Sequence, residues 1–252
     1  MWGYPTGAIP LGLSISARKT LKTLAMQLPE AKVTVETIGE EREPLVIIDN
    51  FTGQPERLRD LGYRSQYYPA GVDYPGRRAP ADPSYLDIRR DLMMQVMARV
   101  FGLSRSIQCE VAAFSIVSLA PEALNARQSI PHHDHSDPGR VAIMHYLDGP
   151  ESGGTAFYRH RRTGFEKITP EREATYAAAL EEDDREFGPV TPGYPSGDSE
   201  RFEQIGAVEA RVDRLALYRG RSLHSGIIPS PDALSEDPRQ GRLTVNMFLY
   251  GT

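Results

Sequence analysis

Apolar and polar residues alternate along much of the second half of the chain, a pattern typical of β-strands with one buried face. The clearest segments are residues 107–119, 141–147, 155–159, 214–219 and 242–250. Glycine and proline, which interrupt regular structure, lie between them. We therefore expect a strand-rich core that begins near residue 107.

The first 106 residues mix helical and extended patterns. Residues 15–28 carry apolar side chains at helical spacing, and strands are expected around Val33 and Val35 and over residues 44–48. Asp82-Pro83 is a typical helix start, with proline in the first turn. The helix expected after it contains Met93, Val96 and Met97 on one face, which we interpret as core packing.

No repeat or low-complexity linker divides the chain, so we expect a single domain over residues 1–252. The expected fold class is mainly β with flanking helices (α+β). Residues 1–106 would pack on a β core formed by residues 107–252. Within the core, residues 160–204 form a long insertion with one expected helix, residues 170–182.

The insertion is acidic, because residues 171–186 contain seven acidic residues and two arginines. The simpler interpretation is a solvated surface segment. The alternative is a mobile lid, since long loops in compact domains often cover a binding site.

Composition excludes several classes of protein. The 252 residues are 40% hydrophobic and 25% charged, which is typical of a globular protein. The net charge of −5 argues against nucleic acid as the main partner. No apolar stretch approaches the roughly 18 residues needed to span a membrane, and the N-terminus does not resemble a secretion signal, so we expect a cytoplasmic protein with no membrane partner.

The chain has one cysteine, Cys109, which excludes an internal disulfide and a cysteine-rich zinc module. Because it falls within an expected strand, we expect it to be buried and unreactive. No Gly-x-Ser-x-Gly motif of a serine nucleophile is present.

All six histidines lie between positions 132 and 224, and three of them fall within residues 131–137, Pro-His-His-Asp-His-Ser-Asp. Side chains at i and i+2 of an extended chain point to the same side, so a histidine and an aspartate at this spacing can bind one cation. Two histidines and one carboxylate form the facial triad of non-haem Fe(II), which leaves coordination positions open. We therefore predict a metal site here.

Two registers compete for this site, His132-x-Asp134 and His135-x-Asp137. Asp137 precedes Pro138-Gly139, and Asp-Pro-Gly is typical of a turn. We therefore favour His132 and Asp134, with His135 at the edge of the site.

The third ligand must come from elsewhere in the chain. His145, His160 and His224 are the candidates, and His224 has the best context because it closely follows the strand expected at residues 214–219 and precedes the final strand.

The final strand has one polar and one apolar face. Arg242, Thr244 and Asn246 alternate with a second, apolar set of side chains: Leu243, Val245, Met247 and Leu249. The polar face fits a cavity inside a barrel, and the apolar face fits packing against helices. A guanidinium in such a cavity can bind a carboxylate bidentately. The alternative for Arg242 is a salt bridge on the surface.

The order His132-x-Asp134, then His224, then Arg242 on a strand resembles the Fe(II)/2-oxoglutarate-dependent oxygenases. Residues 145–148, His-Tyr-Leu-Asp, and 153–157, Gly-Gly-Thr-Ala-Phe, also resemble the Tyr-Leu-Asn and Gly-Gly-x-Thr segment of the prolyl-hydroxylase-like branch. The resemblance covers about residues 107–250. It departs from the family pattern at Asp148, which replaces the asparagine, and in the long interval between Asp134 and His224.

The resemblance implies a double-stranded β-helix, a jelly roll of the cupin type. It places the catalytic metal ligands at His132, Asp134 and His224. It places the distal carboxylate of 2-oxoglutarate at Arg242 and Tyr146, and we include Thr244, on the same face as Arg242. Arg239 is a rival for Arg242, but it follows Pro238 in a proline-containing loop.

The expected function is therefore oxidation of a small-molecule or peptide substrate by Fe(II), O₂ and 2-oxoglutarate, with succinate as co-product. Two alternatives use the same ligands: a zinc-dependent hydrolase, and a non-catalytic cupin-like protein that binds a metal or a small molecule. Residues 67–78, rich in tyrosine, proline and arginine, could line the mouth of a substrate site or form a surface loop.

Overall fold

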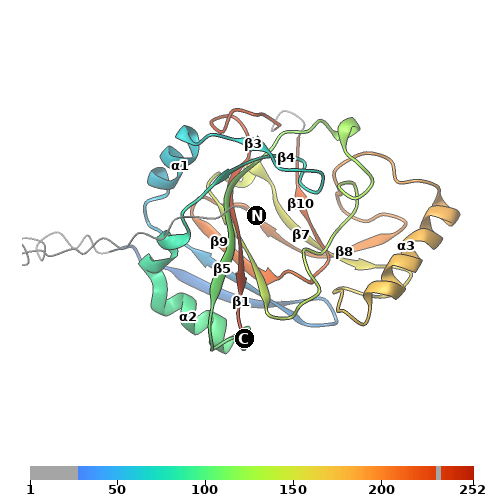
Figure 1. Cartoon of the computed structure of the whole chain (residues 1–252), viewed down its shortest axis with the longest axis horizontal. Coiled ribbons are helices and arrows are strands. Elements are labelled where there is room, and N and C mark those ends of the chain that lie inside the picture. The colour runs from blue at the N-terminus through green and yellow to red at the C-terminus, as the bar shows by residue number, and fades with distance from the viewer. Residues whose placement is uncertain (1–27, 231–233) are drawn as a thin grey trace, which may run out of the picture.

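The computed structural model describes residues 28–230 and 234–252 (Figure 1). The helix expected over residues 15–28 lies outside this part of the chain, except for Leu28. The described strands are β1 (Lys32–Ile38), β2 (Glu43–Asp49), β3 (Tyr68–Pro69), β4 (Gly76–Pro80), β5 (Gln108–Val117), β6 (Arg140–Tyr146), β7 (Gly154–His160), β8 (Phe202–Glu209), β9 (Arg214–Arg219), β10 (His224–Ile227) and β11 (Leu243–Tyr250). The α-helices are α1 (Pro55–Arg64), α2 (Arg90–Arg99) and α3 (Glu173–Phe187), and short 3-10 helices are η3 (Pro83–Arg89), η4 (Pro121–Ala123) and η5 (Pro150–Ser152).

The strands form two antiparallel sheets. The large sheet has the order β1-β2-β9-β6-β11-β5-β4-β3, and the small sheet has the order β10-β7-β8. A mainly β fold with flanking helices is therefore confirmed, and the five strands expected after residue 106 correspond to β5, β6, β7, β9 and β11. Strands β1 to β4, from the first third of the chain, extend the large sheet itself.

Helices α1 and α2 cover the outer face of the large sheet (Figure 1). The apolar face of β11 packs there, as the alternation predicts, together with Met93, Val96 and Met97 of α2. The carboxylate of Asp82 accepts a hydrogen bond from the Ser84 amide, 2.9 Å away, and so caps the start of this region. The first turns are the 3-10 helix η3, and α2 begins only at Arg90.

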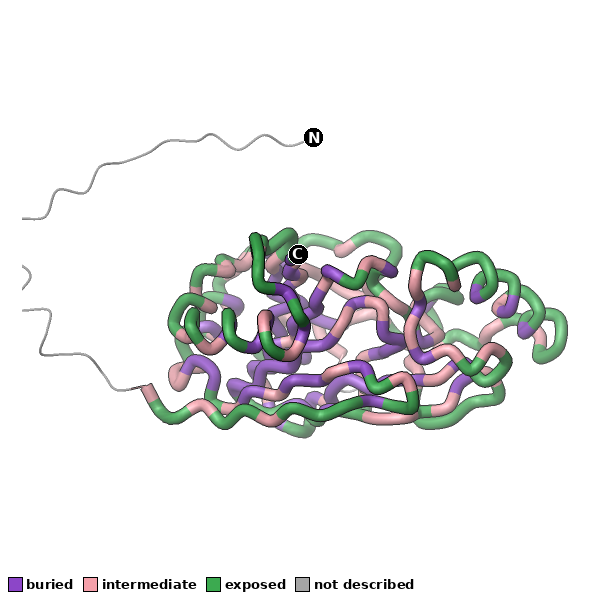
Figure 2. Tube along the Cα trace, turned by 90° about the horizontal axis from the view of Figure 1, so that it is seen from below, coloured by how far each residue is buried: buried purple, intermediate pink, exposed green. Residues whose placement is uncertain are grey.

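The inner faces of the two sheets pack against each other through aromatic and small side chains. The rings of Phe157 on β7 and Tyr218 on β9 meet edge to face, with centroids 5.1 Å apart. Buried segments lie along the middle of the molecule, with exposed segments around them (Figure 2). Because the sheets contact each other here, side chains on the inner faces of β6, β7, β9 and β11 are held in fixed positions.

Helix α3, from the insertion, covers the outer face of the small sheet on the side opposite α1 and α2 (Figure 1). It begins and ends a few residues after the expected helix 170–182, and β8 begins inside the expected insertion. The interpretation of the insertion as a solvated segment is wrong in part, because Tyr176 and Asp183 of α3 are buried. Asp183 bonds His160 of β7, with Oδ2 2.7 Å from Nε2.

Cys109 is exposed, so the expectation of a buried thiol is wrong. The first four residues of β5 are exposed, because this end of the strand extends beyond the covered part of the sheet. Partial burial of the thiol raises the pKa of Cys109. In the residues that the structure describes, no helix has the length and apolar character needed to cross a membrane.

Candidate metal centre

The backbone brings His132 and His224 together. Each residue donates its amide to the carbonyl of the other, with N–O distances of 2.9 and 2.8 Å, so that His132 forms an antiparallel bridge to the first residue of β10. The amide of Asp134 bonds the Gly220 carbonyl at 2.7 Å. These bonds hold an otherwise irregular segment extended, which directs the side chains of His132 and Asp134 to one side.

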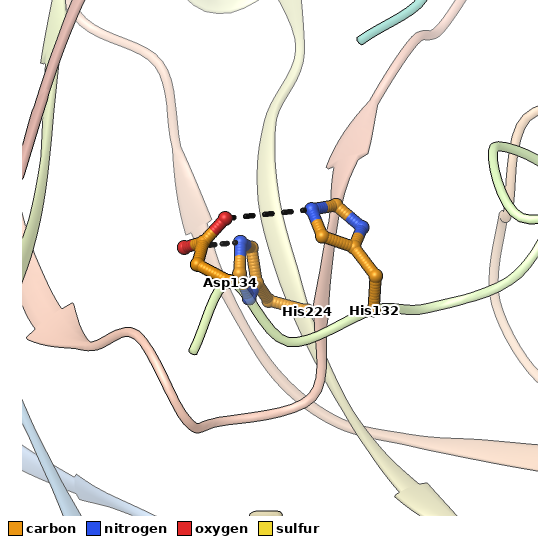
Figure 3. Close-up of side chains that lie close together, drawn as sticks. All are labelled: His132, Asp134 and His224. Carbon is orange, nitrogen blue, oxygen red and sulfur yellow. Dashed lines mark ion pairs between the residues drawn. The ribbon is translucent and has the colours of Figure 1, made fainter. Parts of the chain in front are cut away.

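The three side chains converge on one point (Figure 3). Nε2 of His132 lies 3.8 Å from Oδ1 of Asp134, and Nε2 of His224 lies 3.5 Å from Oδ2. One potential ligand atom from each residue lies within 4.8 Å of the other two. The predicted residues His132, Asp134 and His224 are thus the ones that the fold brings together.

The protonation state of this group suits a cation. Nδ1 of His224 is 2.9 Å from the Ser222 carbonyl, which can only accept, so Nδ1 carries the proton and Nε2 presents its lone pair towards Asp134. The His132 side chain is 50% exposed at the cavity and that of His224 only 7%. Partial loss of solvent around the two rings lowers the pKa of both to about 4, so both imidazoles are neutral near pH 7. A carboxylate that faces imidazole lone pairs is stabilised by a shared cation, and this donor set suits Fe(II) and other divalent metal ions.

The rival register forms a turn. Oδ1 of Asp137 accepts the Gly139 amide at 2.7 Å, and its carbonyl accepts the Arg140 amide at 3.3 Å. His135 accepts the amide of Asp137 through Nδ1, at 2.9 Å. The Asp-Pro-Gly sequence therefore has the turn geometry that its residues predict, and its side-chain groups are used locally.

The other histidines lie apart from the group. His145 is buried between Tyr85 and Asp213, with both contacts at 3.1 Å, and His160 is buried against Asp183. The ring of His133 faces Tyr176 of α3, with centroids 6.2 Å apart.

A cavity of about 740 Å³ opens onto the three residues. Its lining includes Arg242 and Asn246 of β11, Tyr74 and Arg78 at β4, and Tyr176 of α3. Part of the 67–78 segment, including Tyr74 and Arg78, thus lines the cavity, whereas Tyr68 and Val72 of the same segment are exposed on the surface. Arg78 and Tyr176 were not expected individually, because only the packing of β4 and α3 around the group places them there.

Arg242 is buried in the wall of this cavity, so the alternative of a surface salt bridge is wrong. Its Nε and Nη2 donate to the carbonyls of Ser152 and Gly154, both at 2.9 Å. Arg239 is exposed; it lies 3.7 Å from Asp237 and stacks on Tyr63.

The neighbours of Arg242 include the other residues expected to bind the cosubstrate. The centroid of the Tyr146 ring lies 5.8 Å from the guanidinium carbon, and the Tyr146 hydroxyl bonds Thr155 Oγ1 at 2.7 Å. Thr244 is buried, and its hydroxyl donates to Oδ1 of Asn246 at 2.8 Å. Among the described residues, Tyr146 and Thr244 do not themselves line the cavity, whereas their hydrogen-bond partners Thr155 and Asn246 do.

Two residues near the turn before β7 help to form the wall of the cavity. Gly153 has φ +92°, and a β-carbon there would lie 2.0 Å from the Ile227 carbonyl oxygen, so the position requires glycine. Asp148 accepts the amide of Leu243 at 2.8 Å and lies 3.8 Å from Arg59. The carboxylate of Asp148 thus has a structural role at the start of β11.

The sequence matches the model of one protein family over residues 29–249, a family of unknown function designated DUF6445. The chain belongs to this family. No match is found among curated proteins.

Several solved structures have a similar fold. HygX from Streptomyces hygroscopicus, with nickel, 2-oxoglutarate and hygromycin B bound, is 15% identical with a TM-score of 0.42, and the match covers 82% of this chain and 83% of HygX. SnoN, an α-ketoglutarate-dependent epimerase from nogalamycin biosynthesis, is 12% identical with a TM-score of 0.46, over 84% and 77%. An N-substituted L-amino acid dioxygenase from Burkholderia ambifaria is 11% identical with a TM-score of 0.41, over 88% and 95%. These values are too low to transfer the function of those proteins to this chain.

Proposed function

We propose that this member of the DUF6445 family is an Fe(II)- and 2-oxoglutarate-dependent oxygenase. The observation that carries the proposal is the combination of two neutral imidazoles and one carboxylate at a cavity that also contains the buried guanidinium of Arg242. A metal site alone fits a hydrolase equally well. A fixed cation in the same cavity is what an acidic cosubstrate requires.

The connectivity of the strands supports a double-stranded β-helix. From β5 onward, the chain runs from the large sheet to the bridge at His132, back to β6, then to β7 and β8 of the small sheet, to β9, to β10 and to β11. Such repeated crossing between two facing antiparallel sheets is typical of jelly-roll folds. The His132 bridge occupies the position of a fourth strand, beside β10.

His132, Asp134 and His224 would hold the metal ion, and a three-residue ligand set of this kind leaves coordination positions open for other ligands. Fe(II) bound there would supply the oxidative decarboxylation of 2-oxoglutarate to succinate and CO₂ with O₂, and the oxidation of the second substrate. The chain's contribution is to orient the ligands: the Ser222 carbonyl fixes the tautomer of His224, and the backbone bridge fixes its distance to His132.

Arg242 would hold the distal carboxylate of 2-oxoglutarate. Because Ser152 and Gly154 accept bonds from Nε and Nη2, the guanidinium is fixed in advance, and within the described chain Nη1 makes no hydrogen bond that competes with a ligand. We assign Tyr146 to the same subsite through its hydroxyl and Thr155, and Thr244 to the orientation of Asn246.

Anaerobic addition of Fe(II) and 2-oxoglutarate to the metal-free protein tests this proposal. We expect a visible charge-transfer band that is absent in Asp134→Ala, and succinate formation once O₂ is admitted. A zinc hydrolase would give neither the band nor O₂-dependent succinate, and a non-catalytic binding protein would form no succinate. Absence of both signals in protein that binds stoichiometric Fe(II) would refute the oxygenase.

A further inference from the structure

Two adjacent arginines on β4 have different environments. Arg77 faces away from the cavity, forms an ion pair with Glu236 at 3.3 Å and donates to the Tyr67 carbonyl at 3.1 Å. Arg78, the next residue, lines the cavity. Successive side chains of a strand point to opposite faces, so β4 places one paired arginine outside and one arginine inside.

The guanidinium of Arg78 lacks a polar partner. Within the described part of the chain it forms no ion pair and no hydrogen bond, and its Nε is fully buried. The guanidinium lies over the ring of Tyr74, whose centroid is 4.1 Å from the guanidinium carbon. Other partly buried arginines are paired, such as Arg214 with Asp49 at 2.6 Å. Arg78 as a whole is partly buried and lines the cavity. A buried N–H without an acceptor is unfavourable, so this arrangement indicates that an anion bound in the cavity completes it.

Arg78 is near the metal centre but is not part of it. It lines the same cavity as His132, Asp134 and His224. No ion pair joins its guanidinium to Asp134 in the described structure.

The cavity is large enough for two ligands. At about 740 Å³ it is within the range of sites for drug-sized molecules, well above the needs of 2-oxoglutarate alone. If Arg242 binds the cosubstrate, Arg78 remains for a second ligand. Much of the remaining wall is apolar or aromatic: Val117, Ile130, Tyr176, Leu180, Tyr194 and Ile228.

We propose that Arg78 binds an oxyanion group, a carboxylate or a phosphate, of the prime substrate, and that the rest of this small molecule is mainly apolar. The stacked ring of Tyr74 holds the guanidinium plane, which leaves its edge free for two parallel hydrogen bonds to the anion. The anion site itself is inferred from the environment of Arg78 on β4. Only the identification of its ligand as the substrate rests on the proposed oxygenase function.

Matched pairs of charged and neutral ligands test the site. Binding would be measured by calorimetry on metal-free protein and, in parallel, on protein loaded with Mn(II) and 2-oxoglutarate. One arm compares phenylacetate, 4-phenylbutyrate and octanoate with their amides, and the other compares phenyl phosphate and hexyl phosphate with phenol and hexanol. We expect at least one anion to bind roughly tenfold to a hundredfold more tightly than its neutral partner, the range for a charged hydrogen-bonded group. The arm in which this occurs identifies the oxyanion.

Arginine-to-glutamine variants at three positions each remove one positive charge, so a comparison of them separates a specific role of Arg78 from a general effect of net charge. Arg78→Gln should abolish the preference for the anion, and Arg78→Lys should retain part of it. Arg77→Gln, on the opposite face of β4, and Arg127→Gln, at an exposed position of the cavity, should preserve it. Circular dichroism and thermal unfolding would establish that each variant is folded.

Three results would overturn the proposal: an anion preference that survives in Arg78→Gln, no binding by any anion of either arm, or loss of 2-oxoglutarate binding in Arg78→Gln, which would make Arg78 a cosubstrate residue. Failure of the oxygenase proposal is distinguishable. In that case the protein would form no succinate, yet the Arg78-dependent preference would remain in the metal-free protein.

Discussion

Nε2 of His224 lies 3.5 Å from Oδ2 of Asp134, although the two residues flank the whole insertion in sequence. Backbone hydrogen bonds between His132 and His224 and from Asp134 to Gly220 hold the two segments together independently of the side chains. The site is therefore preorganised by sheet formation. A variant that removes one ligand should consequently lose metal affinity without losing the fold.

His132→Ala, Asp134→Ala and His224→Ala should each weaken Fe(II) binding by more than about a hundredfold, since even partners outside the ligand set contribute ten- to hundredfold. Anaerobic calorimetry with Fe(II) measures this. His135→Ala and Asp137→Ala are the controls, because their polar groups bond the turn at residues 137–139. Loss of iron in Asp137→Ala with retention in Asp134→Ala would show that the register is wrong.

Arg242→Ala should raise the dissociation constant for 2-oxoglutarate by roughly tenfold to several hundredfold, equivalent to about 2–3 kcal/mol for a charged hydrogen bond. Fe(II) affinity should barely change. Because Arg242 also bonds Ser152 and Gly154, Arg242→Lys is a milder second variant that keeps the charge. The control is Arg239→Ala, which removes an exposed guanidinium. Equal 2-oxoglutarate binding by Arg242→Ala and wild type would remove Arg242 from the proposed subsite.

The sequence predicts β1, β2, β5, β6, β7, β9 and β11 from local alternation, and it predicts the pair His132 and Asp134 from their spacing. It does not predict β3 and β4 of the large sheet, which are short and lie in a segment rich in proline and glycine. The alternation on β11 is sufficient to place Arg242 and Leu243 on opposite faces of the strand. The turn residues after Asp137 are sufficient to choose His132-x-Asp134 over His135-x-Asp137 as the metal-binding pair. The sequence does not predict β8 or β10. Strand β8, Phe-Glu-Gln-Ile-Gly-Ala-Val-Glu, does not alternate regularly between apolar and polar residues, and β10 has only four residues. Their pairing with β7 determines both strands, and this contact is between segments distant in the chain.

The carboxylate of Asp213 should give the fold a measurable dependence on acid pH. It accepts bonds from the Thr52 hydroxyl at 2.8 Å, from the Gly53 amide at 2.7 Å and from His145 Nε2 at 3.1 Å. Burial raises the pKa of Asp213, but the bonds from His145 and Thr52 outweigh it, so the pKa lies below its ordinary value of 3.8. Such a group stabilises the fold above about pH 4, and this contribution is lost as the pH falls through the folded-state pKa.

Asp213→Asn should therefore be less stable than wild type by about 2–3 kcal/mol near neutral pH, and the difference should narrow below about pH 4. Asparagine tolerates the positive φ of +63° at this position, so the backbone is preserved. Urea unfolding at a series of pH values measures the difference. Asp60→Asn, which changes an exposed carboxylate of α1, is the control and should change stability by less than about 0.5 kcal/mol. A constant difference across the pH range would contradict the assignment.

Asp183 and Asp184 are neighbours in the acidic run of α3, and the sequence alone gives no reason to distinguish them. In the structure the Asp183 side chain is 1% exposed and that of Asp184 is 56% exposed. Asp183 bonds His160 Nε2 at 2.7 Å and Arg162 Nε at 2.5 Å, whereas Asp184 pairs with Arg201. Of the four acidic residues 181–184, only Asp183 is buried, because it contacts β7 and the segment that follows β7.

Asp183→Ala should lower the free energy of unfolding by about 3 kcal/mol, because it leaves the buried His160 without its partner. Asp184→Ala should cost less than about 1 kcal/mol, as expected for a pair with an exposed carboxylate. Helix α3 also contributes Tyr176 and Leu180 to the cavity, so a loosened helix should uncouple 2-oxoglutarate consumption from substrate oxidation in Asp183→Ala, with metal binding unchanged. The variant Glu181→Gln/Glu182→Gln/Asp184→Asn, which changes exposed acids alone, should retain wild-type coupling. If Asp183→Ala and Asp184→Ala lower stability equally, the acidic run is a solvated face and does not attach α3 to the small sheet.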